Sequence, residues 1–144
     1  MIAICRSSLG EAIPPSKRYL GETDQTEYSP LVVGKSYAVY GLLFISDRVD
    51  YLVRTPDQPP FWVPGNLFDL ADSGVPTGWE FCITHLRDGY KDLLAAFKIN
   101  YIVGYPLLVN EYKHYVGLAE RDPEEVRRFI ECVLVGGGTM LDSE

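Results

Sequence analysis

The sequence predicts an α+β domain in which a strongly bent antiparallel β meander, SH3-like or a small half-barrel, packs against two amphipathic helices. Residues 35–85 hold four runs of strand-forming residues separated by turn residues, whereas the apolar residues after position 85 recur at helical spacing. A chain of 144 residues is expected to form a single domain. It divides into an N-terminal arm (1–34), the meander (35–85), and a final part with a helix, a mixed segment and a C-terminal helix (86–144).

The N-terminal arm begins with Ile2-Ala3-Ile4, which is a candidate short strand. Residues 7–30 contain several prolines and many charges but few apolar side chains. Such a segment buries little surface, so we expect an extended loop that lies over the body or is partly mobile.

The first two runs of the meander are Ser36–Ser46 and Val49–Thr55. Both faces of the first run are apolar, which predicts a central strand covered on both sides. Gly41 in its middle predicts a bend or bulge. The second run alternates more clearly and places Asp50 on a face that we expect to be wetter.

The third run joins Phe61–Val63 to Leu67–Leu70, and its flanking prolines favour an edge strand because each removes a backbone donor. The last run is Trp79–His85. Its alternation predicts that Trp79, Phe81 and Ile83 face the core.

The second half changes to helical periodicity. An apolar stripe from Leu86 to Phe97 predicts an amphipathic helix with Asp88 as its N-cap. Tyr101–Val109 is a mixed apolar run, and Tyr115–Ala119 is a candidate strand.

A clear N-terminal helix signal follows at Asp122-Pro123-Glu124-Glu125, where an acid at the N-cap, Pro at N1 and Glu at N3 form a capping-box pattern. The final helix should end at Gly136-Gly137-Gly138, and residues 139–144 should fray.

Charge and cysteine content restrict the class of partner and the compartment. The chain has 20 acids and 13 bases, a net charge of −7, which disfavours nucleic acid and favours a basic protein partner. Three cysteines at no regular spacing indicate free thiols in a reducing compartment. No apolar run approaches the roughly 20 residues of a membrane span, so we expect a cytoplasmic protein that does not interact with membranes.

No catalytic, metal-binding or cofactor-binding set is predicted. Cys82, His85, His114 and Cys132 are zinc-ligand types, but they contain one close pair, and strand geometry puts Cys82 and His85 on opposite faces. No local motif surrounds any cysteine that would mark a nucleophile. The acid pairs Asp69 with Asp72 and Asp47 with Asp50 lie at turns, where Asp is favoured for backbone hydrogen bonding.

Four segments of residues 35–85 carry a family resemblance: Lys35-Ser36-Tyr37-Ala38-Val39-Tyr40-Gly41, Val49-Asp50-Tyr51-Leu52-Val53, Trp62-Val63-Pro64 with Leu67-Phe68-Asp69-Leu70, and Trp79-Glu80-Phe81. This pattern resembles small acidic immunity proteins of bacterial polymorphic or contact-dependent toxin systems. The resemblance implies a cytosolic inhibitor of one toxin domain, and the acidity agrees with a basic, nuclease-like target.

The leading hypothesis is therefore a non-enzymatic protein-binding module. Its predicted partner-binding residues are Asp47, Asp57, Trp62, Asp69 and Asp72. Two alternatives stay open. One is a small enzyme or ligand-binding domain with a pocket between sheet and helices, lined by tyrosines and His85 or His114. The other is a structural or regulatory subunit of an assembly, and the oligomeric state is not predicted.

Overall fold

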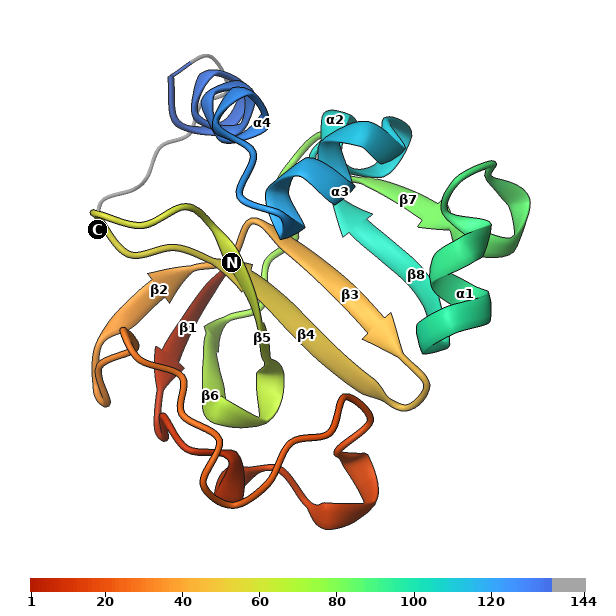
Figure 1. The fold of residues 1–144 in the computed structure, drawn as a ribbon. Helices are drawn as coiled ribbons and strands as arrows, with labels where there is room; N and C mark the ends of the chain where they lie inside the picture. The colour runs from red at the N-terminus through yellow and green to blue at the C-terminus, as the bar shows by residue number, and fades with distance from the viewer. Residues whose placement is uncertain (136–144) are drawn as a thin grey trace.

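The computed structural model describes residues 1–135 and has two antiparallel sheets with helices beside them, which confirms the α+β class. In Figure 1 the smaller sheet lies to the left, the larger sheet crosses the centre, and the helices lie above the larger sheet and to its right. The smaller sheet has the order β2-β1-β6, with bounds β1 Ile2–Cys5, β2 Ser36–Ala38 and β6 Phe68–Asp72. The larger has the order β5-β4-β3-β8-β7, with bounds β3 Gly41–Ile45, β4 Arg48–Val53, β5 Phe61–Pro64, β7 Glu80–Ile83 and β8 Ile99–Gly104.

The helices follow mainly in the second half of the chain. Their bounds are α1 Lys91–Phe97, α2 Pro106–Asn110, α3 Tyr112–Ala119 and α4 Pro123–Phe129, the last continued by a π-helical segment, Ile130–Val135. Short 3-10 turns are η1 Gly10–Ala12, η2 Pro15–Lys17, η3 Gly65–Leu67 and η4 Thr84–Leu86. Within residues 1–135 no helix has the length and apolar character needed to cross a bilayer.

The larger sheet carries a separate hydrophobic core on each face. Because side chains alternate along a strand, Leu43 and Ile45 of β3 face the helices and Leu42 faces the smaller sheet. The helix-side core joins β3, β4, β7 and β8 to all four α-helices. The second core lies between the two sheets and includes Tyr51 of β4 and Phe68 of β6. The molecule is therefore layered as small sheet, large sheet and helices.

The first predicted strand run divides at the bend expected near Gly41. Ser36–Ala38 pairs with β1, whereas Gly41–Ile45 pairs with β4 and β8. Gly41 lies opposite Gly104, and a Cβ on either glycine would approach Leu108 Cδ2 to 2.8 Å. Two glycines thus let Leu108 of α2 pack directly on the sheet backbone.

The prediction of one meander over residues 35–85 holds for β3, β4 and β5, which pair in sequence, but not for β6 and β7. The η3 turn separates β5 from β6, and β6 leaves the large sheet to pair with β1. A Cβ on Gly65 would lie 2.9 Å from the Val49 carbonyl oxygen, so glycine permits this sharp turn. β7 pairs with β8, which comes later in the chain, and neither sheet closes into an SH3-like barrel.

Two predictions about strand faces need correction. In the last run, Trp79 packs against the core between the sheets as predicted, but Phe81 does not face a core. On β7, Cys82 is fully buried and Phe81 is 59% exposed, because the helices cover the Cys82 side. Thr84 continues that side, and its hydroxyl donates to the Ile99 carbonyl at 2.7 Å. On β4, the face expected to be wet holds a buried Asp50, which is paired with Arg48.

Of the predictions about the second half of the chain, one is confirmed and two need correction. The helix predicted from residue 86 begins at Lys91, and Asp88 forms an ion pair with Lys91 at 3.5 Å instead of capping the helix. Tyr115–Ala119 is part of α3 and not a strand. The signal at Asp122 is confirmed, since its carboxylate accepts a hydrogen bond from the Glu124 N–H at 3.0 Å. The predictions for residues 136–144 lie outside the described residues.

The N-terminal arm lies over the body, as one of the two alternatives predicted. Ile2–Cys5 forms the central strand of the smaller sheet, which confirms the predicted short strand. The following loop is closed by a Leu9–Glu27 bridge and by the Gly10 N–H, which donates to the Thr26 carbonyl at 2.7 Å. Ile13 is completely buried and anchors the loop.

Candidate functional site

Three aromatic side chains form a row across β3, β8 and β7 on the face of the large sheet opposite the helices. We call Phe44, Tyr101 and Phe81 the aromatic row. Tyr101 packs edge-to-face against both neighbours, with ring centroids 6.1 Å from Phe44 and 6.2 Å from Phe81. Phe44 lies directly opposite Tyr101 in the ladder, so all three rings project from one face.

The aromatic row is exposed because the smaller sheet covers the other end of this face. The core between the sheets takes side chains from β4 and β5 but none from β7 or β8. Phe81 is 59% exposed and Tyr101 is 43% exposed, while Phe44 is half-buried. β7 is also an edge strand of its sheet. The result is an apolar surface on a rigid, hydrogen-bonded support.

The structure does not bring the four predicted partner-binding acids together. Asp47 lies in the turn before β4 and Asp57 in the loop after it, at opposite ends of that strand. Asp69 and Asp72 lie on β6 in the other sheet, where both are exposed. Asp69 is 3.6 Å from Arg6 Nε, and Asp72 accepts the Gly74 N–H at 2.9 Å.

Trp62, the predicted aromatic anchor, faces the helix-side core. Its ring is half-buried and lies 6.2 Å from that of Tyr115. Its indole N–H is buried, and the described part of the chain offers it no hydrogen-bond acceptor. Trp62 therefore contributes mainly to packing between β5 and α3.

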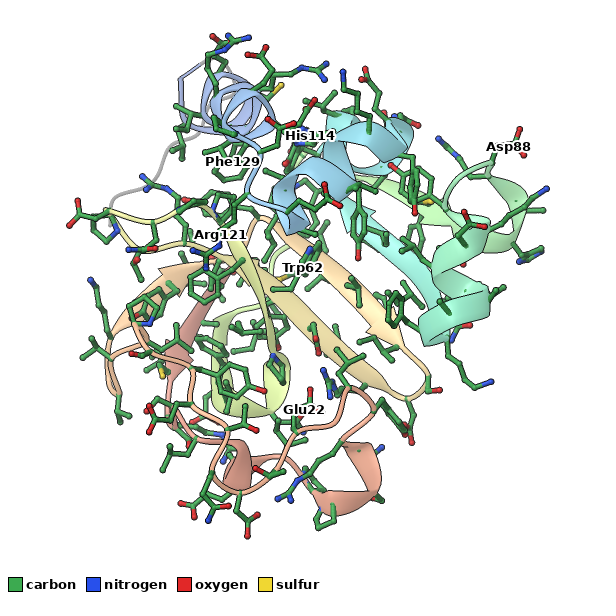
Figure 2. All side chains as sticks on the ribbon, in the orientation of Figure 1. Glu22, Trp62, Asp88, His114, Arg121 and Phe129 are labelled. Atoms are coloured by element: carbon green, nitrogen blue, oxygen red, sulfur yellow. The ribbon has the colours of Figure 1, made fainter. Side chains whose placement is uncertain are left out.

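A buried ionic cluster joins the N-terminal loop to β4. Arg48 donates from Nε and Nη2 to the Asp50 carboxylate at 2.8 and 2.9 Å, and Nη1 lies 3.1 Å from Glu22. Figure 2 shows Glu22 on the N-terminal loop, in the lower part of the view. Nearby, Asp47 accepts hydrogen bonds from Lys17 and from the Tyr19 hydroxyl. Burial raises the pKa of Asp50, and Arg48 opposes this change.

A second buried network connects α3 and α4. His114 is completely buried; its Nδ1 lies 2.9 Å from Glu125 and its Nε2 lies 2.7 Å from the Tyr105 hydroxyl. Glu125 is 1% exposed and also accepts a hydrogen bond from Arg128 at 3.1 Å. Glu125 thus binds a histidine on the preceding helix. It does not accept the Asp122 N–H as a capping box requires, because that N–H donates to the Gly117 carbonyl. Figure 2 shows His114 in this region.

The protonation states of this network follow from its surroundings. Burial lowers the pKa of His114, although the Glu125 carboxylate opposes the change. The hydrogen bond from His114 lowers the pKa of Glu125, and burial raises the pKa of Tyr105. We therefore assign neutral His114 as the tautomer that donates from Nδ1 to Glu125 and accepts the Tyr105 O–H at Nε2. His114 and Glu125 are almost completely buried, so we interpret the network as a contact that links α3 to α4.

The residues weighed for metal or nucleophilic chemistry do not converge. Cys82 is buried in the helix-side core, Cys132 is exposed, and His85 is exposed on η4. Among residues 1–135 no group of three or more His, Cys, Asp or Glu side chains is placed to hold a metal ion. Desolvation raises the pKa of Cys5 and Cys82, which disfavours their thiolate forms.

Comparisons with protein-family models, with curated sequences and with solved structures gave no match. The sequence reasoning missed the aromatic row because its members come from three strands far apart in the chain. The alternation of Phe81 and Cys82 was a local signal, but it was interpreted with Phe81 on the core side, whereas Cys82 is the buried residue. The three rings meet because β8 lies between β3 and β7 in the large sheet.

Proposed function

We propose that this chain is a protein-binding module that acts by docking a basic partner protein on the aromatic row. The observation that carries the proposal is the exposure of Phe81 and Tyr101 on an otherwise well-packed sheet. The resemblance to acidic immunity proteins makes a toxin domain the class of partner that we propose, and inhibition of that domain the outcome of binding.

Aromatic side chains of this kind are effective anchors. Large rings dominate the energetics of many interfaces, and little entropy is lost when they are already held in place. Tyr101 is held by edge-to-face contacts on both sides and by a strand that pairs with two neighbours. The aromatic row would therefore meet a partner with little rearrangement.

The charge of the chain supports a basic partner. A net charge of −7 attracts a positively charged surface and raises its association rate. Lys and Arg side chains also bind well on the faces of aromatic rings, where the cation meets the negative side of the ring. Attraction at long range and contact at short range thus favour the same class of partner.

The test compares two variants that add the same charge at positions of equal solvent exposure. Phe81→Asp places a carboxylate on the aromatic row, and Val33→Asp does so at a residue that is also 59% exposed but precedes β2 in the other sheet. Both substitutions are at exposed positions, so both proteins should fold, which circular dichroism and thermal unfolding will check. Wild type and both variants are used as bait in native cell lysate at low and moderate salt.

We expect wild type and Val33→Asp to retain the same basic protein at equal stoichiometry, and Phe81→Asp to lose it. Binding should weaken as salt increases. The captured protein is then purified and its activity measured with each bait, and wild type but not Phe81→Asp should inhibit it. Equal retention by both Asp variants would overturn the docking surface, and undiminished activity of the captured protein would overturn the inhibitor function.

A further inference from the structure

A small hollow lies at the edge of the molecule where the entry to β2 meets the exit from β4. It has a volume of about 90 Å³ and is partly open to solvent, so it has room for a group the size of a phosphate or a carboxylate. Its lining comes from two segments of the chain: Lys35, Ser36, Tyr37, Arg54 and Pro56.

The charge of this hollow is opposite to that of the protein as a whole. Its lining includes two cations and no acid, although the chain has 20 acids and 13 bases. Across residues 1–135, neither Lys35 nor Arg54 forms an ion pair. Two uncompensated cations in one concave site provide a focused positive potential.

The Arg54 guanidinium has a donor that the folded chain leaves unsatisfied. Its Nε is buried and has no hydrogen-bond partner within the described residues. Its Nη1 makes long contacts of 3.3 and 3.5 Å to the carbonyl oxygens of Thr55 and Pro56. Because Nε is out of reach of solvent, the donor that a ligand can contact is Nη2, which forms no hydrogen bond within the described residues and can donate to an oxygen of a carboxylate or a phosphate.

The other wall of the hollow is held in place. The Tyr37 hydroxyl accepts the Val32 N–H at 2.9 Å, and Lys35 Nζ lies 5.7 Å from the centre of the Tyr37 ring. The Ser36 hydroxyl has no hydrogen bond to another described residue, so it is a third donor at the rim. The positions of the donors are set by β2, which is paired with β1.

From these contacts we infer that the hollow is a binding site for a small anion with a carboxylate or phosphate group. Arg54 donates to one of its oxygens through Nη2, Lys35 supplies a second positive charge, and the Ser36 hydroxyl donates to a remaining oxygen. The site is separate from the aromatic row, so its occupancy does not depend on the proposed partner.

The experiment is an NMR titration of the full-length protein at constant ionic strength with three probes: inorganic phosphate, glycerol phosphate and acetate. We expect saturable shifts of the Arg54 Nε–H and of the backbone amides of residues 35–37. Saturation by the two phosphates alone assigns a phosphate ligand, and saturation by acetate assigns a carboxylate ligand.

Three variants locate the site. Arg54→Met keeps the aliphatic part of the side chain and removes the guanidinium. Lys35→Met removes an exposed cation of the hollow, and the control Lys113→Met removes an exposed cation on α3. Loss of one charge-assisted contact should weaken binding about tenfold or more in the first two variants and leave it unchanged in Lys113→Met. If Arg54→Met does not fold, Lys35→Met decides. The inference is overturned if no probe saturates, or if Lys35→Met binds as tightly as Lys113→Met.

Discussion

Replacing Glu125 with alanine should destabilise the protein far more than the same change one residue earlier. Glu125 is 1% exposed and accepts hydrogen bonds from His114 and Arg128 at 2.9 and 3.1 Å. Without it, the His114 N–H is buried with no acceptor, which costs about 1–3 kcal/mol. The lost Cγ methylene adds about 0.8 kcal/mol. Arg128 is partly exposed and retains Glu111, so its loss is small. We expect the free energy of unfolding to fall by about 2–4 kcal/mol.

Two further variants separate the hydrogen bond from the charge. Glu125→Gln keeps an acceptor for His114 and most of the volume, so it should cost about 1 kcal/mol, since a neutral acceptor is weaker than a carboxylate. Glu124→Ala removes the same charge from the same turn, but Glu124 is exposed and pairs with the exposed Arg127, so its effect should be much smaller. Urea unfolding at neutral pH, extrapolated linearly to water, measures all three.

The pH dependence tests the assigned protonation states. Burial lowers the pKa of His114 in the folded protein. In the unfolded chain the histidine has its ordinary pKa of about 6.5, so near and below this pH the unfolded state binds more protons than the folded state. Stability should therefore fall as the pH is lowered from 7 through this range, and His114→Gln should show a flatter profile. Equal losses in Glu125→Ala and Glu124→Ala, or an identical pH profile after substitution of His114, would refute this account of the network.

Three other substitutions test the remaining local interactions by the same unfolding measurement. Gly117→Ala should destabilise by about 1–3 kcal/mol, although alanine normally favours a helix, because its Cβ would lie 2.2 Å from Glu125 Cγ; a gain in stability would contradict this packing. Asp122→Ala removes the N-cap of α4 and should cost about 1 kcal/mol, most of which Asp122→Ser should restore. Arg48→Met leaves Asp50 buried without its cation and should cost about 3–5 kcal/mol at pH 7. The loss should shrink at lower pH as Asp50 takes up a proton, and a pH-independent loss would argue against this explanation.

Local signals in the sequence predicted the features that depend on neighbours in the chain. Asp122 and Pro123 specify the start of α4 through one cap and one fixed dihedral angle, and both are visible in four residues. The hairpin of β3 and β4 likewise follows from two apolar runs joined by a short turn. In both cases the deciding contacts span only a few positions.

Long-range pairing could not be predicted in this way. β1 pairs with β2 and with β6, and β8 enters the large sheet between β3 and β7. A strand pattern indicates that a face is apolar but not which layer will cover it. Phe81 illustrates the difficulty: helices cover the Cys82 side of β7, and the smaller sheet does not reach the other side. The wrong prediction that Phe81 faces the core is therefore a consequence of the sheet topology.

Tyr115–Ala119 was misassigned for a related reason. Its aromatic and β-branched residues favour a strand in isolation, yet His114, Tyr115 and Leu118 are buried together at helical spacing. The interaction of His114 with Glu125 links α3 to α4, and no pattern within residues 115–119 contains that information.

The acidity of the chain has two different structural roles, and this distinction affects the proposed function. Asp50 and Glu125 are buried and bound to Arg48 and to His114 with Arg128, so these acids hold the N-terminal loop and α4 in place and are inaccessible to a partner. Within residues 1–135 the exposed acids are dispersed over loops, helices and the strands β6 and β7, so they can raise the rate of encounter without specifying a position. The aromatic row, in contrast, is compact and rigidly supported. We therefore expect substitutions of single exposed acids to change mainly the association rate and its salt dependence, and substitutions in the aromatic row to change the dissociation rate.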